Sequence, residues 1–339
     1  MAPLVQETPP ARDLTESRPR TDSREAFSPR TIRSILLFTV AGVVLYGAAS
    51  FASDYRSILA SLLSFPPERL ALVLVLVLVG WLLRGWRFSY YLRNAGDPVP
   101  LGYAIKTFLA GFALTGTPGK LGEAVKGVFL KQDYGVSVTR VVGIVMIERL
   151  MDLWGVLLLG SFSVMLFSGW RGLFFVFAGL VIAGGAFLSM EKLYRPVLER
   201  LGRVSFLTWV SQRVLGILLT GKDLMTLRVF VVGLVVSAVA WGMESFSLYL
   251  ILDGLKLPGT ILEANFVYCF STIVGALSML PGGIGGTEAG MIGLLGFMGI
   301  SYADGLPAVI LIRVCTLWLA VFVGCGFMML MLSRSATRK

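Results

Sequence analysis

Long apolar blocks recur along most of this sequence, and they constrain its fold more than any other feature. They cover residues 34–53, 69–83, 141–167, 172–189, 229–252 and 305–332. Most of them approach the ~20 residues that an α-helix needs to cross a hydrocarbon core of ~30 Å. Because lipid offers no hydrogen bonds to the backbone, a single segment that crosses it has to be helical. The sequence therefore predicts an all-α polytopic membrane protein.

The composition removes several classes of function. Apolar residues make up 56% of the chain and charged residues only 15%, far from the balance of a soluble domain. Histidine, the commonest metal ligand and general base, is absent. Cys269, Cys315 and Cys325 lie apart in apolar segments, without the spacing of metal ligands. We therefore expect no metal, no other cofactor and no catalytic constellation.

The basic residues predict how the chain is oriented. The formal net charge is +10, and Lys and Arg gather near the chain ends and between the apolar blocks rather than on one face. By the positive-inside rule, the tail 1–33, the loop 190–228 and the tail 334–339 are cytoplasmic. We expect the first tail to be disordered and the loop to carry an amphipathic helix on the membrane surface. We expect a cell (inner or plasma) membrane with both termini cytoplasmic, and the charge pattern does not indicate nucleic-acid binding.

Two regions do not fit plain membrane spans. A Pro-Gly-Lys sequence at 118–120 interrupts the region 101–131, and Pro-Gly-Gly at 281–283 interrupts the region 261–298. Proline removes a backbone donor and glycine loosens a helix, so both sequences break helices. The helices that follow the breaks are too short to cross a bilayer. Each region is therefore expected to be a re-entrant hairpin, the first entering from the cytoplasm and the second from outside.

Landmarks recur in the same order in both halves of the chain. A serine- and aromatic-rich sequence ends the second predicted span at 87–92 and the fifth at 245–250, and a proline-glycine break follows each. An arginine then stands five residues before a tryptophan, as Arg149 in the first half and Arg313 in the second. The shared order indicates an internal repeat.

The repeat has a structural consequence. Its units would be residues 34–167 and 172–333, within a single membrane domain 34–333. Each unit holds two spans, a broken hairpin and a third span. Because three crossings is an odd number, the second unit is inverted in the membrane. The sequence thus predicts six transmembrane helices and two re-entrant hairpins, as in transporters whose broken helices form a substrate site near the midplane.

Several charged residues fall inside the predicted spans. Glu148, Arg149 and Asp152 lie about 8–11 residues into the third span, roughly 12–17 Å deep. Arg313 lies at a similar depth in the matching span, and Glu244 lies deep in the fifth. Each such charge costs about 2.5–3.5 kcal/mol on insertion scales. They either pair and lock the helices together or line a polar cavity, and their convergence from both units favours the cavity.

The expected cavity contains two sets of residues. Arginines hold an anionic head group, and the helix N-termini after each break offer backbone N–H groups to phosphate. The expected substrate-binding residues are Arg149, Arg313, Lys120, Glu123, Glu288, Gly119, Gly282 and Gly283. Glu148, Asp152 and Glu244 are expected to form a charge network able to carry protons. Lys120 is equally well a cytoplasmic anchor, and Arg84 and Arg87 are expected to extend to the membrane interface.

The sequences at 116–124, 148–152 and 280–289 resemble the lysylphosphatidylglycerol synthase transmembrane-region family, also called flippase-like domains. The resemblance covers roughly residues 34–332. It implies a domain that moves lipids between leaflets, with aminoacylated phospholipids or lipid-linked sugars as substrates. Bifunctional members carry a soluble aminoacyl-transferase domain after the membrane part, whereas this chain ends at Lys339. We therefore expect no lysylphosphatidylglycerol synthesis here, and a separate synthase or transferase as partner.

The expected function is that of a lipid flippase or scramblase acting on a phospholipid or lipid-linked sugar. The chain has no Gly-x-x-x-x-Gly-Lys-Ser/Thr sequence, so ATP is not expected to supply the energy. Two alternatives remain open at this point. A membrane-embedded lipid-modifying transferase would use the same charged residues for chemistry, and a small-solute secondary transporter would use an inverted repeat closed to lipid.

Overall fold

The computed structural model describes five stretches of the chain and three single positions between 176 and 183. The stretches are residues 55–115, 121–164, 191–201, 226–278 and 280–337. Every regular element in them is a helix, which confirms the all-α prediction for this part of the chain. The tail 1–33, the block 34–53, most of the block 172–189 and most of the loop 190–228 lie outside the described residues.

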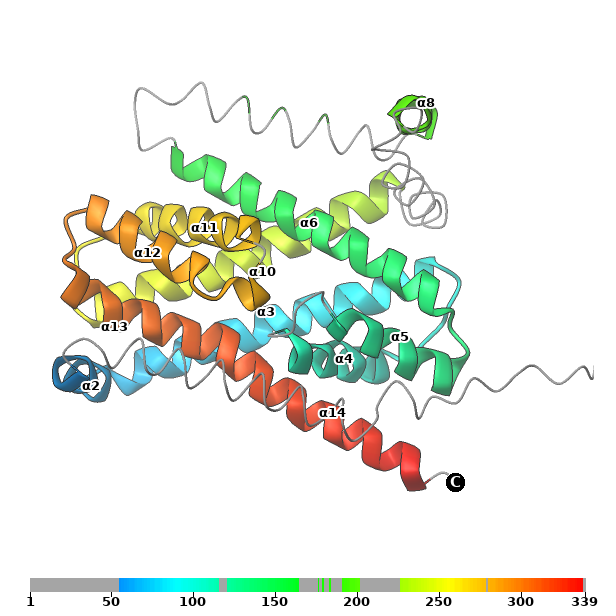
Figure 1. Ribbon diagram of the computed structural model, residues 1–339, viewed down its shortest axis with the longest axis horizontal. Coiled ribbons are helices and arrows are strands. Elements are labelled where there is room, and N and C mark those ends of the chain that lie inside the picture. Colours follow the sequence, from blue (N-terminus) through cyan, green and yellow to red (C-terminus); the bar gives the residue numbers. More distant parts are fainter. Residues whose placement is uncertain are drawn as a thin grey trace, which may run out of the picture.

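Three helices are long and apolar enough to cross a membrane. They are α3 (Pro67–Asn94), α10 (Leu227–Gly254) and the continuous helix Tyr302–Ser333. The last contains α13 (Tyr302–Arg313), a π-helical turn η5 (Val314–Trp318) and the first part of α14 (Leu319–Thr337). The helix α6 (Val138–Val164) has 27 residues, but it carries charged side chains in its middle. These helices form the long bundle in Figure 1.

Two further regions fold as pairs of shorter helices. The first pair is α4 (Leu101–Ala110), extended by the 3-10 turn η1 (Gly111–Leu114), and α5 (Leu121–Tyr134). The second pair is α11 (Ile261–Leu277) and α12 (Gly286–Phe297), with the short turn η4 (Pro281–Gly283) between them. The predicted break at 281–283 is therefore confirmed. The first predicted break, at 118–120, lies outside the described residues, and the re-entrant path of both pairs stays a prediction.

Glycines make the second break. Gly282, Gly283 and Gly285 have φ values of 63°, 67° and 87°, in the left-handed region that favours glycine. Gly275 allows α11 and α12 to approach closely, because a Cβ there would lie 1.9 Å from Oγ1 of Thr287. The chain can therefore turn sharply after α11 and return along it as α12.

Elements that match in sequence run in opposite directions. The start of α3 lies beside the end of α10, where Arg69 pairs with Asp253, and the second half of α3 lies beside the first half of α10, where Arg87 contacts Ser237. The pair α4 and α5 lies at one end of the bundle, whereas α11 and α12 lie at the other (Figure 1). The inverted repeat itself stays a prediction.

The helices α3, α6 and α10 pack together at the centre. Their inward faces bury apolar side chains such as Val77, Ile144 and Leu248. The outward face of α3 instead exposes a stripe of large apolar residues, which consists of Leu72, Val75, Leu78, Val79, Leu82 and Trp86. Water disfavours an apolar surface of this extent, and lipid does not. Together, the long apolar helices and their apolar outer faces identify an integral membrane protein.

Two short helices flank the bundle. The helix α2 (Tyr55–Leu63) lies beside α13, and α8 (Glu191–Leu201) lies near the opposite end in Figure 1. α8 falls in the loop predicted to hold an amphipathic helix. It buries Tyr194, whereas Val197 and Leu201 are exposed. The predicted place of this helix on the membrane surface stays a prediction.

Candidate functional site

Two arginines of α3 point into the centre of the bundle. Arg84 and Arg87 stand three residues apart, so they share one face of the helix. Their exposed fractions are 8% and 1%, and both guanidinium groups meet carboxylates from other helices. The prediction that they extend to the membrane interface is therefore wrong. The packing of α6 and α10 against α3 decides the direction of both side chains.

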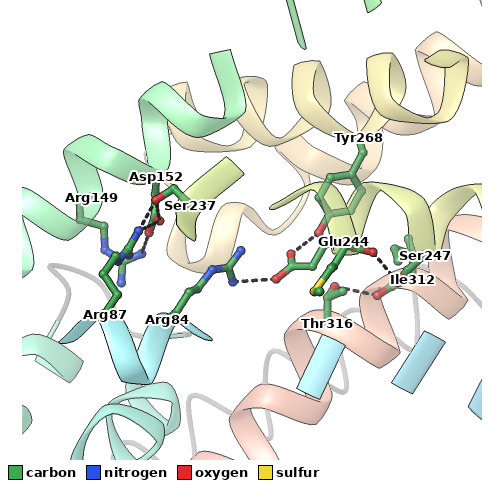
Figure 2. A network of polar contacts seen from close by, with 11 residues as sticks. Arg84, Arg87, Arg149, Asp152, Ser237, Glu244, Ser247, Tyr268, Ile312 and Thr316 are labelled. Carbon is green, nitrogen blue, oxygen red and sulfur yellow. Dashed lines mark hydrogen bonds and ion pairs between the residues drawn. The ribbon is translucent and has the colours of Figure 1, made fainter. Parts of the chain in front are cut away.

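Arg87 joins α3 to α6 and α10 (Figure 2). Its Nη1 donates to Oδ1 of Asp152 at 2.9 Å and to the hydroxyl of Ser237. That hydroxyl in turn donates to the same carboxylate oxygen at 2.9 Å. Gly155 makes room for this contact, since a Cβ there would lie 2.8 Å from Cβ of Ser237. Three helices are thus fastened at one point.

The same arginine also meets Glu148. Nη2 of Arg87 lies 3.8 Å from one oxygen of that carboxylate, and Nζ of Lys126 lies 3.4 Å from the other. Lys126 belongs to α5 and is 4% exposed. Its ammonium group stands 4.9 Å from the ring centre of Phe88 and 4.4 Å from that of Phe108, at cation–π distances. The first short-helix pair is therefore tied electrostatically to α6.

A second group of contacts surrounds Glu244 of α10. Nη1 of Arg84 donates to its Oε1 at 2.7 Å, and the hydroxyl of Tyr268 on α11 donates to its Oε2 at 2.6 Å. The ring of Trp241 lies under the guanidinium group of Arg84, with 4.4 Å between the ring centre and Cζ. Figure 2 shows Arg84 reaching from α3 toward this carboxylate, beside the Arg87 group.

Arg313 and Glu288 meet at the second helix break. Nε of Arg313 donates to Oε1 of Glu288 at 2.6 Å, and its Nη2 donates to the carbonyl of Gly282 at 2.9 Å. The other oxygen of Glu288 accepts the backbone N–H of Gly285 at 2.7 Å. The structure thus brings Arg313, Glu288 and Gly282 together, and in this conformation they hold the break itself.

The remaining predicted residues occupy different settings. The side chain of Arg149 is 50% exposed, and its Nη1 lies 3.9 Å from Oδ2 of Asp152, as the i, i+3 spacing predicted. Gly283 lies in the break next to Gly282. Its expected part in substrate binding stays a prediction. Gly119 and Lys120 lie outside the described residues, and the side chain of Glu123 does as well.

Sequence reasoning missed Lys126 and Tyr268 and misjudged Arg84 and Arg87. For Lys126 a signal existed, because it is a lone cation among the apolar residues 124–130 of a short helix. For the tyrosine and the arginines no local signal was decisive. Aromatic and basic residues near the end of a span usually mark the interface, and only the neighbouring helices show otherwise.

The buried charges balance. Arg84, Arg87 and Lys126 stand against Glu148, Asp152 and Glu244, and each cation lies within 4 Å of a carboxylate oxygen. We call these six residues the buried ion-pair network. Pairing offsets much of the cost of removing charges from water, whereas deleting one partner leaves a buried charge uncompensated. In the described part of the chain, no cluster of three His, Cys, Asp or Glu side chains suits a metal ion.

Comparison with known proteins agrees with the membrane architecture. The family described as the lysylphosphatidylglycerol synthase TM region matches residues 34–324. A UPF0104 membrane protein of Methanothermobacter thermautotrophicus is 27% identical over 148 residues, which is 43% of this chain and 42% of that relative. A UPF0104 membrane protein of Methanocaldococcus jannaschii is 25% identical over 219 residues, or 61% of this chain and 88% of that relative. The alignment thus spans less than half of the first relative.

Proposed function

Since the chain belongs to the lysylphosphatidylglycerol synthase transmembrane-region family, we propose that it is a flippase or scramblase that carries a lipid head group between leaflets. The head group passes the buried ion-pair network while the acyl tails stay in the bilayer. The substrate is a phospholipid or a lipid-linked sugar, and a separate synthase or transferase supplies it. The chain resides in the cell membrane with both termini in the cytoplasm.

The observation that carries this proposal is the burial of six paired charges among apolar helices. Ionisable groups within membrane helices are costly, and in membrane proteins they commonly mark a substrate or ion path. The network links four helices, namely α3, α5, α6 and α10. Next to it, Arg149 is half exposed and within 3.9 Å of Asp152. A polar head group would meet this arginine first and the buried pairs next.

The proposed architecture has six transmembrane helices and two re-entrant hairpins in an inverted repeat. Its support is the opposite placement of the α4–α5 and α11–α12 pairs, together with the confirmed break at 281–283. In transporters of this kind the broken helices meet near the midplane and form the binding site. We place Arg149, Lys120, Glu123 and Gly119 on the substrate path of the first half.

In the second half the substrate path includes Arg313, Glu288, Gly282 and Gly283. In the conformation described, Arg313 donates one hydrogen bond to Glu288 and one to the carbonyl of Gly282. It can hold a head group only after one of these contacts opens. Glu148, Asp152 and Glu244 keep the arginines in place and serve as candidate proton carriers during the transition.

Lipid exchange in reconstituted liposomes tests the proposal. The purified protein is incorporated into vesicles with a fluorescent phospholipid, and dithionite quenching measures how fast label leaves the inner leaflet. We expect exchange well above that of protein-free vesicles, slowed by Arg149→Gln, which alters a half-exposed side chain. Labelled phosphatidylglycerol and phosphatidylcholine are compared, with a labelled lipid-linked sugar as a third probe. An exchange rate equal to that of empty vesicles for all three lipids would rule out the proposed activity.

A further inference from the structure

Arg84 presents an unused pair of hydrogen-bond donors in the protein interior. Its Nη1 is engaged by Glu244, whereas its Nε and Nη2 are buried and donate to no acceptor among the residues that the structure describes. These two nitrogens lie on one side of the planar guanidinium group. Their N–H bonds run parallel, and this edge matches two oxygens of a phosphate or carboxylate group.

A third unpartnered donor belongs to the aromatic ring that stacks on this guanidinium group. The indole Nε1 of Trp241 is also buried without an acceptor in the described part of the protein. The same indole ring packs 4.4 Å from Cζ of Arg84. Leaving a charged N–H group buried and unpaired is costly, and native interiors satisfy such groups with water or a bound ion. The cluster therefore indicates an occupant that is an acceptor.

Arg313 shows what a satisfied edge looks like in the same molecule. Its Nε and Nη2 are taken by Glu288 and by the carbonyl of Gly282. The corresponding nitrogens of Arg84 have no such partners. Of the two arginines, Arg84 is thus the one that can receive two oxygens of a ligand without first breaking contacts of the protein.

The charge near the site favours an anion over a cation. The buried ion-pair network is neutral by itself, with Arg84, Arg87 and Lys126 opposed by Glu148, Asp152 and Glu244. The half-exposed Arg149, 3.9 Å from Asp152, adds one positive charge beside the network. A phosphate diester carries one negative charge, which this surplus positive charge attracts.

We propose that the Nε/Nη2 edge of Arg84, together with Nε1 of Trp241, binds the phosphate group of the transported lipid. The identity of this ligand rests on the proposed lipid transport. Arg84 is only 8% exposed in the conformation described, so a ligand cannot reach it without movement of the surrounding helices. The phosphate reaches the edge when the helices around α3 separate, as carriers of the inverted-repeat type do around a fixed site.

A binding experiment on the purified, detergent-solubilised protein tests this site without measuring transport. The probes are dihexanoylphosphatidylglycerol, dihexanoylglycerol (which lacks the phosphate) and inorganic phosphate, with affinities taken from calorimetry. Arg84→Lys keeps the positive charge next to Glu244 but removes the planar edge. Trp241→Phe keeps an aromatic ring under the cation but removes the indole donor. Arg69→Lys is the matched control, since Arg69 also lies on α3 and pairs with Asp253 of α10.

We expect the unmodified protein to bind the phospholipid and not dihexanoylglycerol. Arg84→Lys should weaken binding about tenfold or more, which is the effect of losing a charged hydrogen bond. Trp241→Phe should weaken it several-fold, and Arg69→Lys should leave it unchanged. Competition by inorganic phosphate would identify a free-phosphate site, whereas no competition identifies the phosphate of a lipid.

The opposite result is equally clear. If Arg84→Lys and Trp241→Phe both bind the phospholipid like the unmodified protein, the edge holds only water and the site is overturned. Equal binding of the phosphate-free lipid overturns it as well. Thermal unfolding of each variant checks that it is folded. If Arg84→Lys does not fold, the affinity of Trp241→Phe for the phospholipid decides whether the site exists. Binding that depends on Arg84 in a protein without lipid exchange would instead contradict the proposed function alone.

Discussion

Arg87 and Asp152 lie 65 residues apart in the chain and meet in a 2.9 Å hydrogen bond between α3 and α6. Arg87 is 1% exposed, and the hydroxyl of Ser237 bonds to both partners. A guanidinium group that is buried in this way has no contact with water, so its carboxylate partners must offset the cost of burying its charge. The pair makes the positions of three central helices depend on one another.

Removal of Arg87 should destabilise the protein strongly. Arg87→Gln leaves Asp152 and Glu148 with much less compensation in the interior, and we expect a loss of about 3–5 kcal/mol in the free energy of unfolding. Fluorescence-detected thermal unfolding in detergent measures the change. Arg69→Gln is the control, because its exposed pair with Asp253 should contribute only about 0–1 kcal/mol. Adding Asp152→Asn to Arg87→Gln should restore part of the loss. Similar melting temperatures for the two single variants would contradict a role for the buried pair.

Arg149 should separate transport from folding. Its side chain is half exposed, so Arg149→Ala removes little packing and should shift the melting temperature only slightly. We expect lipid exchange in liposomes to be abolished, because the head group loses its first cation. Thr139→Ala serves as the control, since Thr139 is an exposed residue of the same helix. Unchanged exchange in Arg149→Ala would show that this arginine has no part in the substrate path.

Arg313 should act on the second helix break as well as on transport. Arg313→Ala should still insert and fold, yet it removes the contacts to Glu288 and to the carbonyl of Gly282. We expect faster hydrogen–deuterium exchange in residues 281–288, together with loss of lipid exchange. The physical reason is that backbone groups of the break lose the side chains that hold them. Exchange protection equal to that of the unmodified protein would mean that the break is stable without Arg313.

The contact between α11 and α12 should not accommodate an added methyl group at Gly275. A Cβ at Gly275 would lie 1.9 Å from Oγ1 of Thr287, so Gly275→Ala should cost about 1–3 kcal/mol through overpacking. Gly293→Ala on α12 is the matched control, because a Cβ there meets nothing within 4 Å. It should be neutral or slightly stabilising, given the higher helix propensity of alanine. Thermal unfolding compares the two, and Thr287→Ala should relieve part of the Gly275→Ala defect. Equal stability of both glycine variants would contradict the tight contact.

Much of the architecture could be read from local properties of the sequence. The length of the apolar blocks predicts helices that cross a bilayer, and α3, α10 and Tyr302–Ser333 have the required length and composition. The proline and glycines at 281–283 predict a helix break, because they act on the backbone whatever surrounds them. The spacing of Arg149 and Asp152 likewise predicts their contact on one helix.

The sequence by itself thus determined the membrane class, the second helix break and the presence of charges at depth. Only the tertiary structure decided which charges meet. Arg84 and Arg87 have the sequence position of interfacial residues, yet they pair with Glu244 and Asp152, which lie 160 and 65 residues further along the chain. Side-chain length lets an arginine reach either the membrane surface or a partner. The choice depends on whether another helix brings a carboxylate within hydrogen-bonding distance, and no local pattern contains that information.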